Sequence, residues 1–447
     1  MDIKNHYSSG WRDYQGKLKR GERRKALLKR LSVSALYSGC GLLVLFLVFY
    51  AGSRISGYLS QAGFVPLHVE KPPGVFREKI PRQDPSFVLN NLDLDYRVLA
   101  HRFVVEKDGT RLTVQSSLDT SLQDKILALL KRSRTVQAAV VVLSPTDGRI
   151  LAMANYEKGG QGDNLCTKAV FPAASLFKIV SAAAALETAG FTPERAVLFT
   201  GGKHTLYKRQ LKKKAGPYAT KISFSKAFGS SINSVFGKMG IYDLGRTVMT
   251  EYAERFFFNR VIPFDFPVEQ STINVPDDDY GLAEIASGFN RETLISPLHA
   301  ALLAAAVVNN GTMMAPRLVE RVFKESGELL YQSRPTMLTS PISRGTAKDL
   351  KVLMRDTILN GTCRKTFHAL RRSRAFRDVE LGAKTGTIND KLDQFKYDWL
   401  TVYALPKDGT KGICMAVLSV HGEKLGIRAN ELGRYIRLSG SRFTVQG

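Results

Sequence analysis

Two side chains three residues apart are the first feature of this sequence that could carry out acyl transfer. Ser175 and Lys178 stand at the two ends of the sequence SLFK, at the start of an apolar run that reads as a helix from Ser175 to Ala189 and closes at Gly190. Because residues i and i+3 share one face of a helix, the lysine amine can reach the serine hydroxyl. A serine needs an adjacent base to become a nucleophile, and a lysine can be that base where burial or nearby cations lower its pKa.

This pair alone does not identify a nucleophile. Most serine–lysine pairs at this spacing are neighbours on a solvated helix surface. The chain also contains a second copy of the pattern, at Ser223 and Lys226. Ser175 can be distinguished from Ser223 only by further functional groups at suitable distances along the chain.

A second motif, Ser231-Ile232-Asn233, follows 56 residues after Ser175. The hydroxyl of Ser231 can relay a proton, and the amide of Asn233 can both donate and accept hydrogen bonds. The same residue types are also typical of a polar cap or a turn with no catalytic role.

A third motif, Lys384-Thr385-Gly386-Thr387, begins 153 residues after Ser231. A lysine beside two hydroxyls makes a site for a carboxylate. Gly386 removes a side chain where another backbone must approach closely, as an incoming peptide substrate would. The alternative is an ordinary strand end with a turn glycine.

Hydrophobic patterning predicts the elements that position these motifs. The run 136–143 and the run 149–153 flank a turn that contains Pro145 and Gly148, which is typical of a hairpin. Strands that bracket a helical middle indicate an α+β or mixed α/β fold, a sheet covered by helices. The other expected elements are strands at 111–116, 399–405 and 412–420, and helices at 122–130, from Ser296-Pro297 to Asn310-Gly311, and at 428–436.

The order and spacing of the three motifs resemble those of the penicillin-recognising serine enzymes. The resemblance to the transpeptidase domain of penicillin-binding proteins covers about Arg111 to Ile436. It includes the hairpin sequence AAVVVLSPTDGRILAMAN at 138–155, where Asp147 is inserted relative to the family pattern. Ser223 lies only eight residues before Ser231, which leaves no room for the intervening helix and loops, and it is therefore excluded.

The resemblance implies a central antiparallel sheet flanked by helices, with an all-helical subregion, and a role for each motif. Ser175 would attack the carbonyl of a D-alanyl-D-alanine stem peptide, with Lys178 as the base. Ser231, hydrogen-bonded to Lys178, would pass a proton to the leaving amine. Asn233 would hold the substrate amide.

The third motif would bind the rest of the substrate. Lys384, Thr385 and Thr387 would receive the terminal carboxylate, with Gly386 between them. The backbone N–H groups of Ser175 and Thr387 would form the oxyanion hole.

The N-terminal part of the chain predicts a membrane anchor. Residues 31–52 form an apolar segment of the length needed to cross a bilayer. The preceding residues 1–30 carry ten lysines and arginines against three acidic residues, which indicates a cytoplasmic N-terminus. A cleaved signal peptide and a buried helix are the alternatives, and both fit the long basic lead less well.

The remaining chain would lie outside the membrane. Residues 53–110 read as a stalk or small packing module, and 111–447 as the transpeptidase domain. Residues 53–110 are too short for the glycosyltransferase domain or large pedestal of other penicillin-binding proteins, so we expect a monofunctional enzyme.

Composition excludes some other classes. The net charge of +25 favours polyanionic partners, but no zinc-finger spacing, Walker A loop or RNA-binding signature accompanies it, so nucleic acid is not expected. The seven histidines form no ligand cluster, and no metal or cofactor is expected.

Cys40 and Cys414 read as buried thiols, whereas Cys166 and Cys363 could pair in an oxidising compartment. The basic loop Lys203 to Lys214 is either a solvated loop or a contact for lipid phosphates or anionic wall polymers.

The resulting hypothesis is a single-pass D,D-transpeptidase of the inner membrane that crosslinks peptidoglycan and is inhibited by β-lactams. Its expected partners are stem peptides ending in D-Ala-D-Ala, β-lactams, the membrane and other wall-synthesis proteins. A D,D-carboxypeptidase or β-lactamase-like hydrolase is an alternative within enzymes. A non-catalytic penicillin-binding sensor or scaffold is the alternative of another class.

Overall fold

The computed structural model describes residues 100–107, 109–160, 164–214, 216–408 and 412–436, all within one compact unit, Lys79–Gly447. The predicted membrane span at 31–52 and most of the predicted stalk lie outside the described residues. Among the residues that are described, no helix has both the length and the apolar character needed to cross a membrane.

A five-stranded antiparallel sheet forms the centre of the domain, in the spatial order β13-β14-β15-β3-β4. The predicted hairpin is confirmed as β3 and β4, and Gly148 in its turn has a φ of +74°, a left-handed conformation that favours glycine. The third motif lies on β13, an edge strand, and is therefore accessible to an added strand. The strand bounds are β3 Gln137–Leu143, β4 Ile150–Glu157, β13 Val379–Asn389, β14 Lys396–Pro406 and β15 Ile413–His421.

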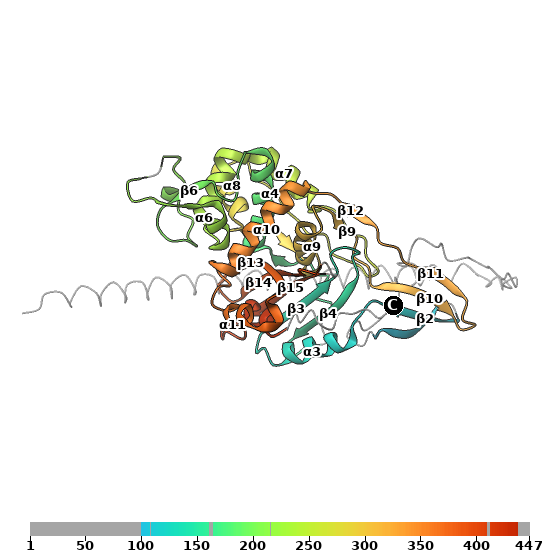
Figure 1. Cartoon of the computed structure of the whole chain (residues 1–447). Coiled ribbons are helices and arrows are strands. Elements are labelled where there is room, and N and C mark those ends of the chain that lie inside the picture. The colour runs from blue at the N-terminus through green and yellow to red at the C-terminus, as the bar shows by residue number, and fades with distance from the viewer. Residues whose placement is uncertain (1–99, 108, 161–163, 215, 409–411, 437–447) are drawn as a thin grey trace, which may run out of the picture. The chain divides into compact units, whose positions relative to one another are not determined.

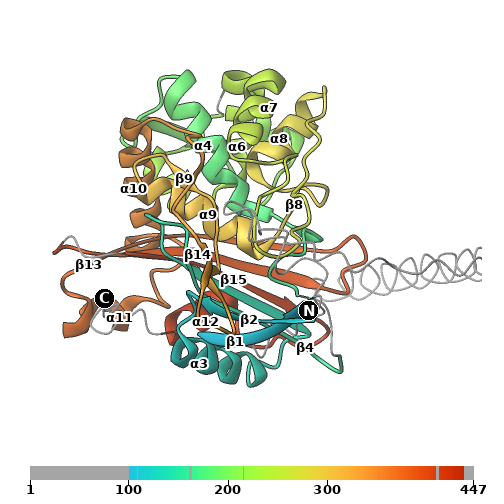
Figure 2. The ribbon, with the colours of Figure 1, turned by 90° about the vertical axis from the view of Figure 1, so that its right-hand side faces the viewer.

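Helices cover both faces of this sheet (Figure 2). Every residue of β15 is buried, and its side chains alternate between two cores: Ala416 and Leu418 face one, Met415 and Val417 the other. A strand buried on both faces explains why β15 is apolar throughout. The larger core lies under α4 Lys178–Thr188, α5 Phe224–Gly229, α6 Asn233–Met239, α7 Gly245–Arg255, α8 Asp279–Ser287, α9 Pro297–Val308 and α10 Arg344–Leu359. The opposite face carries α3 Thr120–Lys131, α11 His368–Arg372 and α12 Ala429–Tyr435.

The cap predicted at Ser296 is confirmed. Its side chain accepts a hydrogen bond from the backbone N–H of His299 at 3.1 Å, and Pro297 is the first residue of α9. Every residue of α9 except Val308 is buried, and the helix packs on β3, β14 and β15. It therefore ties the sheet to the helical region above it.

A second sheet lies beside the main one, in the order β1-β2-β10-β11 (Figure 1). It has its own small core around Val114, Val319 and Val322. The strands of this second sheet are β1 Arg102–Lys107, β2 Thr110–Ser116, β10 Val319–Lys324 and β11 Leu329–Gln332. Three short strand pairs lie elsewhere in the domain. They are β5 Phe171–Pro172 with β8 Leu294–Ile295, β6 Ala196–Phe199 with β7 Thr220–Ser223, and β9 Met313–Met314 with β12 Met337–Thr339.

Cys166 and Cys363 do not pair. Both are buried free thiols, as is Cys414, and they belong to the two different cores on opposite faces of the sheet. Burial raises the pKa of Cys363 to about 12. The disulfide considered between Cys166 and Cys363 is therefore not formed, because the sheet separates the two residues.

Candidate active site

Ser175 lies in a single 3-10 turn, Ala174–Phe177, that runs directly into α4. The α-helix predicted to begin at Ser175 thus begins at Lys178. The backbone is strained immediately before the serine, because Ala174 has a φ of +49°. The glycine of the third motif allows a close approach here: a Cβ on Gly386 would lie 3.2 Å from the backbone nitrogen of Ser175. The backbone that packs against Gly386 is therefore that of the nucleophile's own turn.

The amine of Lys178 is completely buried and points at Ser175. Its Nζ lies 2.8 Å from Ser175 Oγ, and it donates to Asn233 Oδ1 at 2.8 Å and to the carbonyl of Ser287 at 2.5 Å. None of these partners is a carboxylate. Burial, and secondarily the charge of Lys384, lowers the pKa of Lys178 well below its ordinary value. A neutral amine at this distance can accept the serine proton.

Ser231 lies between α5 and α6, and Asn233 is the first residue of α6. Asn233 Nδ2 donates to the carbonyl of His204 at 2.8 Å, which orients its Oδ1 toward Lys178. Ser231, with a left-handed φ of +54°, accepts a hydrogen bond from Lys384 Nζ at 3.0 Å. The hydrogen bond expected between Ser231 and Lys178 is thus replaced, because Ser175, Asn233 and the carbonyl of Ser287 already surround the Lys178 amine.

Lys384 is the second buried amine of the site. Besides Ser231, its Nζ donates to the carbonyl of Thr385 at 2.7 Å. Burial lowers the pKa of Lys384 to about 7. Near neutral pH this amine is therefore partly protonated, and it can bind an anion or exchange a proton.

Thr387 is held by a polar cluster that the sequence did not reveal. Its hydroxyl donates to Asp398 Oδ1 at 2.6 Å, and Arg428 Nε lies 3.2 Å from Asp398 Oδ2. Burial alone would raise the pKa of Asp398, but His421, Thr387 and Arg428 together outweigh it and lower the pKa. Asp398 lies opposite Thr387 in the β13–β14 register, a pairing that the structure shows and no local sequence pattern marks.

Thr362 joins the second and third motifs and was also missed. Its backbone N–H donates to the carbonyl of Gly229 at 3.0 Å, just before Ser231. Its hydroxyl lies 2.6 Å from that of Thr385. The loop after α10 therefore contacts both the segment before Ser231 and the third motif. No local sequence pattern marks these contacts.

Trp399 anchors the segment before the nucleophile. Its indole Nε1 donates to the carbonyl of Pro172 at 2.9 Å, and its ring makes an edge contact with Phe171. Trp399 on β14 lies opposite Gly386 on β13. The β13–β14 pair therefore positions both the third motif and the segment before Ser175.

The second serine–lysine copy has a structural role. Ser223 caps α5, its hydroxyl accepting from the backbone N–H of Lys226 at 3.3 Å, while the Lys226 side chain is exposed. This pair therefore lacks the buried amine that distinguishes Lys178.

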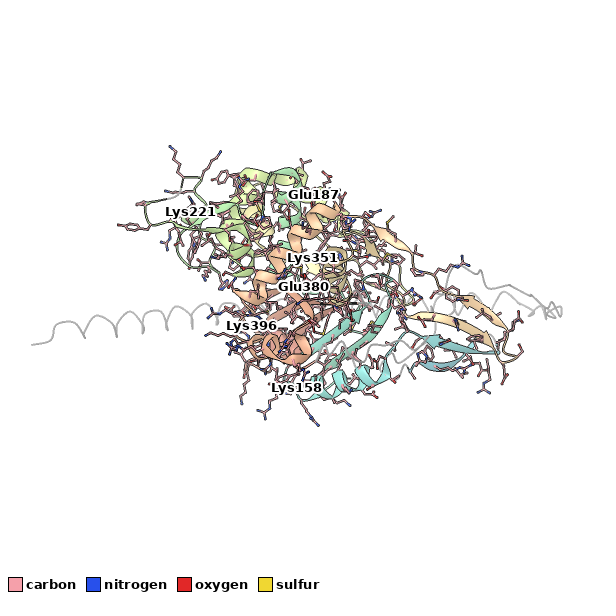
Figure 3. All side chains as sticks on the ribbon, in the orientation of Figure 1. Lys158, Glu187, Lys221, Lys351, Glu380 and Lys396 are labelled. Carbon is pink, nitrogen blue, oxygen red and sulfur yellow. The ribbon has the colours of Figure 1, made fainter. Side chains whose placement is uncertain are left out.

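The basic loop 203–214 lies at the second motif. The carbonyl of Lys203 accepts from the backbone N–H of Asn233 at 2.8 Å, and the carbonyl of His204 accepts from its side chain. No acidic residue occurs from 195 to 242. None of the lysines and arginines in this stretch makes an ion pair within the described part of the chain. One of them, Lys221, lies on the β6–β7 lobe at the upper left of Figure 3.

Comparison with protein families agrees with the fold. The model of the penicillin binding protein transpeptidase domain matches residues 138–432. This chain belongs to the penicillin-binding protein transpeptidase family.

Its curated relatives are distant. A peptidoglycan D,D-transpeptidase PbpA from Mycolicibacterium smegmatis is 24% identical over 320 residues, which are 63% of this chain and 62% of the relative. The penicillin-binding protein PbpB of the same species is 23% identical, over 57% of this chain and 41% of its own length. This chain therefore matches less than two thirds of the length of either relative.

Solved structures share the fold at similarly low identity. The crystal structure of PBPA from Mycobacterium tuberculosis has a TM-score of 0.58 and 21% identity, and the match covers 73% of this chain and 80% of that one. The D,D-transpeptidase domain of a peptidoglycan glycosyltransferase from Eggerthella lenta has a TM-score of 0.59 and 21% identity, with 72% and 81% covered.

Proposed function

We propose that this protein is a membrane-anchored, monofunctional D,D-transpeptidase that crosslinks peptidoglycan stem peptides through an acyl-enzyme on Ser175. β-Lactams would acylate the same serine. The observation that carries the proposal is the buried amine of Lys178, 2.8 Å from Ser175 Oγ and without a carboxylate partner. Only a neutral lysine can activate a serine, and this environment favours the neutral form.

The acylation step uses both amines. Ser175 Oγ attacks the carbonyl of the penultimate D-alanine, and its proton passes to Lys178. The C–N bond to the terminal D-alanine then breaks, and the leaving amine takes a proton from Ser231. Lys384, 3.0 Å from Ser231, replaces that proton. A pKa of about 7 for Lys384 suits proton transfer near neutrality.

The substrate would add to the free edge of β13 as an extended strand. Its terminal carboxylate would meet Lys384, Thr385 and Thr387, and Asn233 would hold its amide. The backbone N–H groups of Ser175 and Thr387 would stabilise the oxyanion, each contributing roughly 3 kcal/mol to the barrier reduction. An amine of a neighbouring stem peptide would then attack the acyl-enzyme and release Ser175.

The location follows from the N-terminal sequence. We place the chain in the inner membrane with one span at 31–52, a cytoplasmic N-terminus and an extracytoplasmic catalytic domain. The support is the apolar segment and its ten flanking cations.

The proposal is tested with a peptide ending in D-Ala-D-Ala and an amine acceptor, with products identified by mass spectrometry. We expect release of D-alanine and an acceptor-linked peptide from the wild type, none from Ser175→Ala, and normal turnover by the matched control Ser223→Ala. Exclusive formation of the shortened peptide would assign a D,D-carboxypeptidase instead. No release of D-alanine by the wild type would contradict both activities.

A further inference from the structure

A pocket of about 550 Å³ lies outside the acyl-transfer site, at the end of α10 and the start of α11. Four of its lining side chains are cationic or can become so, and the fifth is apolar. Figures 1 and 2 both show α11 on the opposite side of β13 from α4 and α6. The lining residues are Leu359, Arg364, Lys365, His368 and Arg371.

No ion pair in the described part of the chain neutralises the positive charge around this pocket. From 357 to 377 the chain contains six lysines and arginines and no acidic residue. Within the described part of the chain none of these six makes an ion pair. Like charges that converge on one cavity repel each other, and an anion in the cavity would relieve that repulsion.

The cations project from a fixed frame. Cys363 and Phe367, which flank Arg364 and Lys365, are completely buried in the core. The backbone N–H of Phe367 donates to the carbonyl of Cys363 at 2.9 Å, and that of Arg371 donates to the carbonyl of Phe367 at 3.0 Å. A backbone that is already fixed loses little loop entropy on binding.

We propose that this pocket binds a phosphate-bearing ligand. Two guanidinium groups can each offer a bidentate pair of N–H donors, a geometry that matches phosphate oxygens. Lys365 and His368 would contact the oxygens that remain. The volume lies in the range of small-molecule sites. The same chemistry fits a soluble phosphate and the headgroup of an anionic phospholipid. This inference is independent of the activity proposed for Ser175.

The pocket is connected to the acyl-transfer site through two residues. Arg364 follows Cys363 and Thr362, and Thr362 contacts both Gly229 and Thr385. A ligand that holds Arg364 would therefore also restrain the loop that joins the second and third motifs.

Binding is measured on the purified full-length chain in a neutral detergent, by calorimetric titration with pyrophosphate at constant ionic strength. The test variant is Arg364→Ala/Arg371→Ala. The charge-matched control is Lys125→Ala/Arg132→Ala, which removes two exposed cations of α3 and its C-cap. We expect the test variant to bind at least about 10-fold more weakly than the wild type, and the control to bind like the wild type.

Equal weakening in both double variants would show non-specific attraction to a basic surface and overturn the proposal, as would no binding by the wild type. Arg371→Lys keeps the charge and loses the bidentate fork, so weaker binding by this mild variant is also expected. Its unchanged circular dichroism would exclude misfolding. Displacement of pyrophosphate by dihexanoyl phosphatidylglycerol, and not by dihexanoyl phosphatidylcholine, would assign the lipid headgroup as the source. No displacement by either lipid would assign a soluble phosphate.

Discussion

Replacing Lys384 by methionine should remove a specific dependence of stability on pH. The Lys384 amine is fully buried, its only hydrogen-bond partners among the described residues are Ser231 and Thr385, and burial lowers its pKa to about 7. In the unfolded chain the same amine has its ordinary pKa of about 10.4. Methionine has a similar length and no charge, so the variant isolates the ionisation.

The sign and size follow from proton linkage. Between about pH 7 and pH 10 the unfolded state holds a proton on this lysine that the folded state lacks, so wild-type stability rises with pH. One bound proton corresponds to about 1.4 kcal/mol in the free energy of unfolding per pH unit. Below about pH 7 the amine is charged in both the folded and the unfolded state. Wild-type stability is then lowered by the full cost of burying the charge, and this group no longer makes it depend on pH. Relative to Lys384→Met, the wild type should therefore gain about 1.4 kcal/mol between pH 8 and pH 9.

The assay is urea unfolding of the full-length protein at pH 7, 8 and 9, followed by tryptophan fluorescence. The difference in unfolding free energy between wild type and Lys384→Met is plotted against pH. Titrating groups that are not coupled to Lys384 cancel in this difference, and Lys226→Met controls for loss of one exposed charge. Parallel pH profiles for wild type and Lys384→Met would show instead that folding leaves the pKa of this amine unchanged.

Two further predictions concern penicillin acylation, and a third concerns stability. The second-order rate constant should fall as pH rises above about 7, because Lys384 loses the charge that binds the carboxylate, and stopped-flow measurements from pH 6 to 9 test this. Gly386→Ala should slow acylation by about 10- to 100-fold, because its Cβ would lie 3.2 Å from the backbone nitrogen of Ser175; an unchanged rate would contradict this contact. Thr362→Val should cost about 1 kcal/mol of stability, since its hydroxyl bond to Thr385 is lost; thermal unfolding measures it.

Local sequence patterns predicted the elements that local physics determines. Ser296 followed by Pro297 predicts the start of α9, and the apolar runs around Gly148 predict the hairpin, because capping and strand pairing use neighbouring residues. The motif order also brings Ser175 and Lys384 into one site. The strict spacing between motifs, rather than any single motif, carried that information.

Contacts between distant segments were the part that sequence could not supply. Ser231 bonds to Lys384 rather than to Lys178, because Asn233 and a backbone carbonyl already occupy the Lys178 amine. Thr362 reaches the third motif across 23 residues. Such contacts depend on how helices pack on the sheet, and several arrangements are compatible with the same local patterns.

Ser175 is identified as the nucleophile, or rejected, by labelling the full-length protein with a fluorescent penicillin and mapping the adduct by peptide mass spectrometry. We expect one adduct, on Ser175, that disappears in Ser175→Ala and persists in Ser223→Ala. Labelling that survives Ser175→Ala, or an adduct mapped to another residue, would contradict this assignment.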